Sequence, residues 1–295
     1  MHKSAMRSNG KRQKAKNTVV EENYGSVLFR RNMVPYHHVE KETRVFCNWH
    51  LLSGAPLDNP IIFDMGFEDL MKRKSLVDLC AQLTTTLNYN TTVHYPVPLL
   101  FANLDQDSFF YRRMKQFNVH SFPDGCMSVT EKGLTDLDNI PIESLIYLSP
   151  DATETINEYQ EDKVYVIGGL VDLGAVQAQK TTLTIANELG IKRQKLPLSK
   201  YLLWGNRSGR RTLSLDIIFK VLLELRSTGN WAKAFQHIPV RCHRGLTECG
   251  IEEAEKTKDI NLMRHYADIF QHKERVSKPR NNKDSYQFLA WDSKA

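Results

Sequence analysis

The sequence has few cysteines, and they do not form close pairs. Their number is odd, their spacing is wide and no CxxC motif occurs: Cys47, Cys80, Cys126, Cys242 and Cys249. Disulfide frameworks and structural zinc sites need paired thiols, so neither is expected. Cys242 and His243 near Cys249 lack a further ligand at suitable spacing, and we expect unrelated surface thiols and no metal. A reducing compartment such as the cytosol, nucleus or mitochondrial matrix fits this pattern.

Long apolar runs and common ligand-binding motifs are also missing. The longest apolar runs have the length of a strand, for example residues 98–102, whereas about 20 apolar residues are needed to span a bilayer. We therefore expect no membrane protein. The chain contains no GxGxxG, GxxxxGK[ST] or HExxH motif, and no Ser-His-Asp or Cys-His arrangement is recognisable. A hydrolase is not supported.

Charge is abundant but unevenly placed in this chain of 295 residues with a net charge of +6. Residues 1–20 carry six bases and no acid, so the remainder is balanced. Residues 131–172 carry ten acids and two bases, whereas residues 191–245 carry twelve bases and two acids. The basic block either binds a polyanion or is neutralised in the fold by the acidic block. Composition alone does not decide between these alternatives.

The ends of the chain differ from its middle. Residues 1–22 are polar and basic, which predicts a disordered arm or the remnant of a targeting peptide. Residues 23–59 are expected to form an N-terminal extension, residues 60–250 the main domain, and residues 251–295 a polar C-terminal helix with a tail.

Apolar periodicity in the main domain predicts alternating strands and helices. Such alternation is typical of an α/β fold with a mostly parallel sheet and helices on both faces. The expected strands are residues 61–64, 98–104, 144–148, 163–167 and 195–198. The expected helices are residues 67–87, 109–117, 181–189 before Gly190, 213–226 near Gly229, and 250–275.

The carboxyl ends of these strands are the expected ligand site, because open parallel sheets bind ligands there. Gly168 and Gly169 follow one strand and would allow positive φ and close approach to a ligand, or form a plain tight turn. Two carboxylates stand out. Asp172 follows the glycines and could be an ordinary turn residue. Asp216 lies in the first turn of an apolar helix, where acids are favoured by the helix dipole.

Several ordered segments resemble one known family. They are SLIYLSPD (144–151), KVYVIGGLVD (163–172), LPLSKY (196–201), TLSLD (212–216) and GNWAKAFQHIP (229–239), preceded by FDMGFEDLM (63–71) and LFANL (100–104). Over residues 60–247 this set resembles the tRNA purine-9 N1-methyltransferases, a branch of the SPOUT class. The resemblance implies a C-terminal trefoil knot, an arrangement that is rare among proteins. It also implies S-adenosyl-L-methionine (SAM) as cofactor and a monomeric enzyme.

The resemblance also implies roles for individual residues. Three loops and a closing segment would hold SAM through Leu148, Ser149, Val166, Gly168, Gly169, Leu196, Leu198 and Leu213. Asp216 would act as a base or orient the purine, and Asp172 would be the second catalytic residue. Substrate contacts would come from Asp64 and Asn103, and phosphate contacts from Lys192, Arg193, Arg207, Arg210 and Arg211. The loop 173–180 is less polar than the family leads us to expect, and residues 207–211 look like a basic insertion.

KYLLW (200–204) and Asp216 resemble the mitochondrial branch of this family, because guanosine-specific relatives usually carry Asn at the latter position. That branch implies a location in the mitochondrial matrix and tRNA or pre-tRNA as substrate. It also implies, as partners in mitochondrial ribonuclease P, a short-chain dehydrogenase and a separate nuclease subunit. The alternatives are a tRNA-binding scaffold with vestigial methylation, or a nuclear or cytosolic N1-guanine-9 methyltransferase. The sequence leaves open whether adenine or guanine is methylated.

Overall fold

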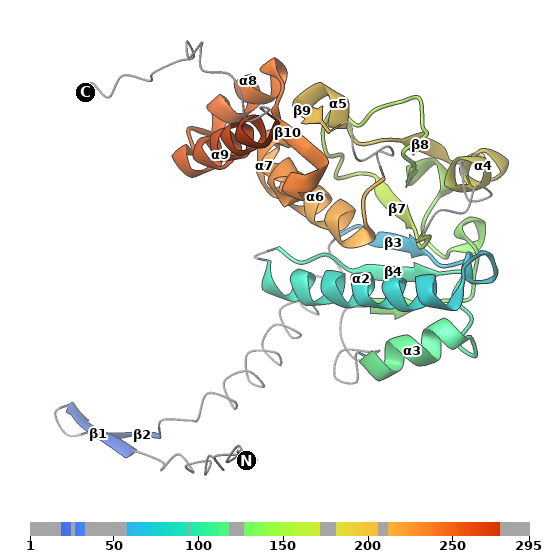
Figure 1. Cartoon of the computed structure of the whole chain (residues 1–295). Coiled ribbons are helices and arrows are strands. Elements are labelled where there is room, and N and C mark those ends of the chain that lie inside the picture. Colours follow the sequence, from blue (N-terminus) through green and yellow to red (C-terminus); the bar gives the residue numbers. More distant parts are fainter. Residues whose placement is uncertain are drawn as a thin grey trace, which may run out of the picture.

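The structure is a computed structural model that describes residues 19–24, 27–32, 58–93, 95–117, 127–171, 181–205 and 212–277. Its centre is a six-stranded sheet with helices on both faces (Figure 1). The strands are β3 (Ile61–Asp64), β4 (Leu99–Ala102), β5 (Met127–Val129), β6 (Leu145–Leu148), β7 (Val164–Gly168) and β8 (Lys192–Gln194). Their order is β5-β4-β3-β7-β6-β8, and every pairing is parallel. The predicted α/β class is confirmed.

Both faces of the sheet are buried, which explains why β3 has a continuous apolar sequence rather than an alternating one. Ile61 and Phe63 point into the cluster that contains helices α2 (Arg73–Thr92), α3 (Phe109–Phe117) and α6 (Leu215–Thr228). Ile62 lies in the opposite cluster, with Ala186 of α4 (Thr181–Glu188). The Phe63 ring lies 6.3 Å from the Phe219 ring of α6, so α6 is packed over the centre of the sheet.

Strands are added to the sheet first on one side of β3 and later on its other side, so the strand order has a switch point between β3 and β7. From β3 it proceeds through α2, β4 and α3 to β5, while β7, β6 and β8 lie on the other side. The crossover helices α2 and α4 cover opposite faces. Such a switch point leaves a crevice at the carboxyl ends of the two strands. Asp64 and Gly168, which are paired in register, lie at that place.

Helix α2 differs at both ends from the predicted helix 67–87. A 3-10 turn, η2 (Glu68–Leu70), comes first, and α2 begins only after Lys72, whose backbone is extended. The helix continues to Thr92 although its apolar pattern fades. Buried Asn90 explains this extension, because its amide accepts from Val97 N at 3.1 Å and donates to Val97 O at 2.8 Å. That contact stabilises the turn into β4.

The predicted strand 195–198 is wrong. The strand is instead the polar segment Lys192–Gln194, and Leu198 begins the short helix α5 (Leu198–Tyr201). Strand β8 lies at the sheet edge, where polar side chains are tolerated. Leu196 and Leu198 are apolar because they pack against the core from the connection that follows β8, so their hydrophobicity did not indicate a strand.

The C-terminal part surrounds a second small sheet. Strand β9 (Leu202–Trp204) pairs antiparallel with β10 (His243–Leu246), and α7 (Trp231–Ala234) follows α6. The single helix predicted over 250–275 is two helices, α8 (Glu248–Thr257) and α9 (Ile260–Ser277), because Lys258 between them adopts a left-handed φ of 53°. The remaining 3-10 turns are η3 (Leu134–Asp136), η4 (Ile142–Ser144), η7 (Phe235–His237) and η8 (Val240–Cys242).

Near the N-terminus, β1 (Val19–Tyr24) and β2 (Val27–Asn32) form an antiparallel hairpin. Residues 19–22, predicted to be disordered, therefore belong to a strand, while residues 1–18 lie outside the described part. Within the residues that the structure describes, no helix is both long and apolar enough to cross a membrane.

Candidate functional site

Asp64 ends β3 at the switch point of the sheet and is almost fully buried. Its carboxylate accepts hydrogen bonds from Tyr147 Oη at 2.8 Å, Asn103 Nδ2 at 2.7 Å and Gly66 N at 3.3 Å. Burial, together with the Asp64 charge and this hydrogen bond, raises the pKa of Tyr147 well above its usual value. The hydroxyl of Tyr147 therefore remains a donor. A buried carboxylate needs such donors, and these contacts give Asp64 a structural role in joining β3, β4 and β6.

Asn103 joins the neighbouring loops. It follows β4 with a φ of 54°, a conformation that asparagine tolerates better than most residues. Its backbone N–H donates to Lys132 O at 3.0 Å, and its side chain bonds Asp64. Asp64 and Asn103, the two residues predicted to contact substrate, are thus brought together and joined by a hydrogen bond.

Gly168 and Gly169 do not use the positive φ that glycine allows, since within the described ranges the glycines with positive φ are Gly190, Gly229 and Gly245. Close packing explains both residues instead. A Cβ on Gly168 would lie 2.8 Å from Thr182 Cγ2, and one on Gly169 would lie 2.8 Å from Asp64 O. Gly169 N also donates to Asp64 O at 2.7 Å. The glycines therefore let the ends of β7 and β3 approach each other.

Ser149 shapes the chain just after β6. It is buried, its N–H donates to Gln194 O at 3.0 Å, and its hydroxyl accepts from Thr182 Oγ1 at 3.0 Å. The side chain of Val166 is fully buried in the cluster on the α4 face. Ser149 and Val166 therefore fix the strand ends through protein contacts.

Apolar side chains from three separate segments contribute to the core on the face of the sheet that carries α6. Leu148 and Leu198 are buried there, and Leu196 and Leu213 are partly buried and pack against the same core cluster. Leu148 ends β6, Leu196 and Leu198 follow β8, and Leu213 precedes α6. We call these four leucines the leucine wall.

Asp216 lies in the first turn of α6, as predicted, with 17% of its side chain exposed. Its Oδ2 lies 3.4 Å from Lys220 Nζ, one turn along the helix. That ammonium lies 5.4 Å from the centre of the Tyr89 ring on α2. Leu215 N donates to Gln82 Oε1 of α2 at 3.0 Å, which satisfies a backbone donor at the start of α6. Sequence analysis missed Lys220, although spacing of four residues on a helix was a usable signal.

Other predicted site residues lie elsewhere or outside the described part of the chain. Asp172, Arg207, Arg210 and Arg211 fall in the undescribed segments 172–180 and 206–211. Lys192 and Arg193 lie on edge strand β8. Of the cysteines in the described ranges, Cys80 is buried, Cys242 partly buried and Cys249 exposed. In the same ranges, no group of three or more His, Cys, Asp or Glu side chains is placed to hold a metal.

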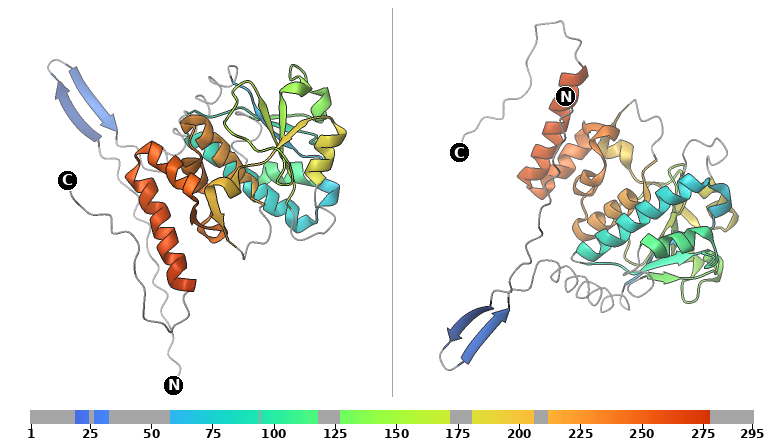
Figure 2. Two further views of the ribbon diagram at one scale, coloured as in Figure 1. Left: turned by 90° about the horizontal axis from the view of Figure 1, so that it is seen from above. Right: turned by 60° about the horizontal axis from the view of Figure 1, so that its bottom comes forward.

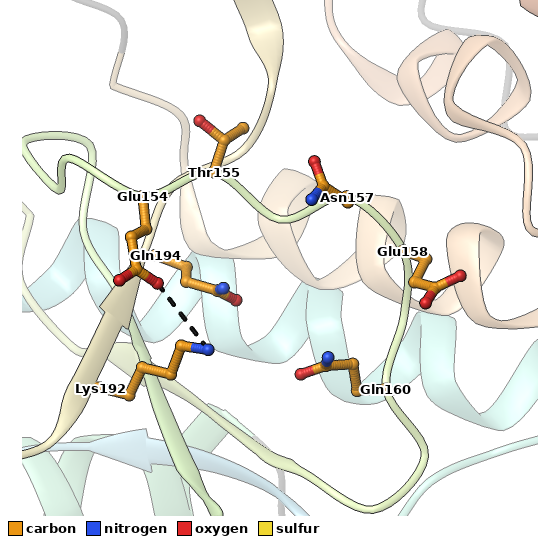
Figure 3. Close-up of a pocket in the computed structure, with 7 residues that line it drawn as sticks. All are labelled: Glu154, Thr155, Asn157, Glu158, Gln160, Lys192 and Gln194. Carbon is orange, nitrogen blue, oxygen red and sulfur yellow. Dashed lines mark ion pairs between the residues drawn. The ribbon is translucent and has the colours of Figure 1, made fainter.

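A polar cavity of about 460 Å³ lies beside β8 (Figure 3). Lys192 and Gln194 line it from the strand, and residues of the segment 154–160 line it from the opposite side. Lys192 Nζ lies 3.8 Å from Glu154 Oε2. The cavity contains carboxylates and amides but no part of the leucine wall.

Comparison with known proteins connects this geometry to a family. The family model described as "tRNA (guanine(9)-N(1))-methyltransferase TRM10/TRM10A" matches residues 2–243. The mouse protein "tRNA methyltransferase 10 homolog C" is 30% identical over 268 residues, which is 89% of this chain and 62% of that protein. The Drosophila melanogaster "Mitochondrial ribonuclease P protein 1 homolog" is 28% identical over 183 residues, covering 61% of this chain and 40% of that protein.

Among solved structures, the full-length spTrm10 complex with SAH resembles this chain with a TM-score of 0.54 and 30% identity, covering 61% of this chain and 97% of that one. The chain spans about 60% of the length of the mouse and human tRNA methyltransferase 10 homolog C proteins.

Proposed function

The chain belongs to the tRNA (guanine(9)-N(1))-methyltransferase TRM10/TRM10A family, and from this premise we propose that it transfers the methyl group of SAM to N1 of the purine at position 9 of tRNA. The observation that supports this most is that the leucine wall and Leu215 in the first turn of α6 belong to one apolar cluster, with Leu148, Leu196 and Leu198 at or after the carboxyl ends of β6 and β8. This is the side of the sheet where α/β folds bind ligands. The structure of spTrm10 with SAH is similar in fold.

The residues present fit a SAM molecule. Leu148, Leu196, Leu198 and Leu213 are the proposed apolar contacts for its adenosyl part; Leu196 and Leu213 are partly exposed, and Leu148 and Leu198 are buried. When bound, SAM supplies an electrophilic methyl group. The role of this chain is to hold the purine N1 in line with that group and to exclude water, because correct positioning lowers the barrier to transfer.

Asp216 is the proposed residue that meets the purine. Guanine N1 carries a proton that must leave during transfer, and a carboxylate can accept it. Adenine N1 already has a lone pair, so a carboxylate need only orient the amino group at N6 and take its proton from the methylated product. An aspartate at this position thus permits either purine. Asp172, which follows the loop after β7, is the proposed second catalytic residue and orients the substrate.

The proposed substrate, location and partners rest on the names of relatives and on two sequence features. A relative named a mitochondrial ribonuclease P protein 1 homolog, together with KYLLW and Asp216, supports mitochondrial tRNA as substrate in the matrix. It also supports a place beside a short-chain dehydrogenase and a nuclease subunit in pre-tRNA processing.

A C-terminal trefoil knot is also proposed. After edge strand β8 the chain must cross back to α6, which packs over β3. The connection between β6 and β7 contacts α7 through the bond from Trp231 Nε1 to Asn157 O at 2.7 Å. This contact places α7 against the β6–β7 connection, which supports the proposal that the returning chain passes through that connection.

The test is methyl transfer from SAM to mitochondrial tRNA transcripts that carry A9 or G9, with and without the dehydrogenase. Transfer to A9 by the wild type and its loss in Asp216→Asn are expected, with SAM binding unchanged. Lys256→Gln on α8 is the control. No transfer under any condition, together with tight tRNA binding, would replace the enzyme by a tRNA-binding scaffold.

A further inference from the structure

The polar cavity beside β8 contains a buried amide whose side-chain polar atoms have no partner in the described part of the chain. Gln194 lines the cavity and is only 8% exposed. No residue in the described ranges forms a hydrogen bond with its side-chain amide. A buried amide without a partner costs free energy. A molecule in the cavity that supplies hydrogen-bonding groups would remove that cost.

A second amide lies across the cavity from Gln194 (Figure 3). Gln160 is partly buried, and its Oε1 atom is buried without a hydrogen-bond partner. Because no described residue forms a hydrogen bond with this side chain, its amide can rotate toward the cavity without breaking one. The two amides therefore offer hydrogen-bonding groups from opposite walls.

The wall opposite β8, formed by the segment 154–160, is held in place at both ends. Lys195 N, just after β8, donates to Glu154 O at 2.9 Å. Further along the segment, Asn157 O accepts from Trp231 Nε1 of α7 at 2.7 Å. Little conformational freedom is lost when a ligand enters a cavity whose walls are already fixed, and this favours binding.

The charges around the cavity favour a cation over an anion. Two carboxylates, Glu154 and Glu158, line it together with the ammonium of Lys192. Lys192 Nζ lies 3.8 Å from Glu154 Oε2, and the two side chains are 49% and 60% exposed, so this ion pair is weak and exchangeable. It joins the basic block 191–245 to the acidic block 131–172, so neutralisation in the fold, one of the two alternatives that composition left open, applies to Lys192. Glu158 forms no ion pair within the described ranges.

We propose that this cavity binds a small organic cation that carries N–H donors, such as a guanidinium compound or a polyamine. Its volume of about 460 Å³ lies in the range of small-molecule sites, roughly 300–1,000 Å³. Glu154, Asn157 and Glu158 are exposed at its rim, so a ligand can enter past them. The cation donates to the Glu158 carboxylate and to the oxygen of Gln194. The cavity contains no part of the leucine wall, so this proposal goes beyond methyl transfer and does not depend on it.

The first test measures binding to the full chain by isothermal titration calorimetry, with agmatine and spermidine as probes. We expect saturable binding of at least one of these amines with a stoichiometry of one. Tetramethylammonium, a cation without N–H groups, is the control and should bind at least about tenfold more weakly, because it cannot form hydrogen bonds with the amides and carboxylates. No saturable binding of either amine would mean that the cavity holds only water and would overturn the proposal. Equally tight binding of tetramethylammonium would overturn it too.

A buried variant tests the role of the amide. Gln194→Met keeps the volume of the side chain but removes its polar atoms, and should weaken binding of the amine about tenfold or more, since a hydrogen bond to a charged group is lost. The midpoint of urea unfolding should not fall, because the amide has no partner in the described part of the chain. A lower midpoint together with wild-type binding of the amine would make the amide structural and contradict the proposal.

An exposed pair of variants tests the charge and leaves the core untouched. Glu158→Gln should weaken binding of the amine about two- to fivefold. Glu188→Gln is the matched control, because Glu188 is an exposed acid on α4, and α4 lies on the opposite side of the sheet from α6 (Figure 2). The control should bind the amine as the wild type does. Equal affinities in the two variants would mean that the amine binds outside this cavity and would overturn the proposal.

Discussion

Asp216 depends on two residues that a motif search does not connect with it. Lys220 lies one helical turn away with its ammonium 3.4 Å from Asp216 Oδ2, and Tyr89 of α2 lies beneath that ammonium. Glu224, Lys233 and His237 continue the same polar row along α6 and into η7. The lysine holds the carboxylate in one orientation, and the tyrosine holds the lysine.

We predict that Lys220→Met lowers kcat for methyl transfer while the KM values for SAM and tRNA stay near wild type. The half-buried ion pair is worth up to about 1 kcal/mol, which corresponds to a loss of roughly two- to fivefold. Lys220→Arg should retain most of the rate because it restores a cation. Single-turnover transfer measures the effect, and equal rates in Lys220→Met and Lys220→Arg would contradict the positioning role.

The second prediction at the residue scale concerns the buried carboxylate. Tyr147→Phe removes the donor to Asp64 Oδ2 and leaves a buried charged oxygen short of one hydrogen bond. The free energy of unfolding in urea should fall by about 1–3 kcal/mol. Tyr165→Phe on the adjacent strand is the control, because its hydroxyl only accepts from Gln160 N at a half-buried loop. A smaller loss in Tyr147→Phe than in Tyr165→Phe would show that Asp64 does not need this donor.

At the scale of elements, the ends of β3 and β7 lie close together because glycine carries no side chain that would keep them apart. Gly168 at the end of β7 leaves room for Thr182 and Tyr147, and Gly169 lets the backbone after β7 touch β3, where Gly169 N donates to the carbonyl of Asp64. A phosphate-binding loop would use glycine for its conformational freedom, whereas here glycine is required because neighbouring atoms occupy the space of a Cβ. The distinction can be measured.

Gly169→Ala should destabilise the fold by about 1–3 kcal/mol, since overpacking forces the backbone apart. Because the shift would separate β7 from β3, methyl transfer should fall as well. Gly205→Ala is the matched control, since its Cβ would meet Cys242 O at an ordinary 3.4 Å. Urea unfolding and transfer assays measure both variants. Unchanged stability and activity in Gly169→Ala would mean that a Cβ fits between the ends of β7 and β3 without a backbone shift.

Some boundaries of helices and strands can be predicted from the local sequence, and others cannot. The stops at Gly190 and Gly229 were predicted and are confirmed, since both residues have positive φ. Strand β8 could not be predicted, because an edge strand of Lys, Arg and Gln has no apolar signal. The break between α8 and α9 depends on one residue with left-handed φ, Lys258, and lysine gives no local warning of that conformation.

At the scale of the whole molecule, strand order places the switch point of the sheet, and ion pairs join segments that are far apart in the sequence. Helices α2 and α4 cover opposite faces of the sheet, so the switch point between β3 and β7 lies between them. Carboxylates from distant segments of the chain pair with Lys192 and Arg226.

The sequence by itself determined the α/β class, the alternating elements, and the place of Asp216 in the first turn of a buried helix. These properties depend on local periodicity and on neighbours within a few residues. Only the tertiary structure decided that Asp64 and Asn103 bind each other, that the glycine pair serves close packing, and that Lys192 and Arg226 pair with Glu154 and Glu161. Each of those depends on groups far apart in the chain, whose distances are fixed only when the sheet assembles.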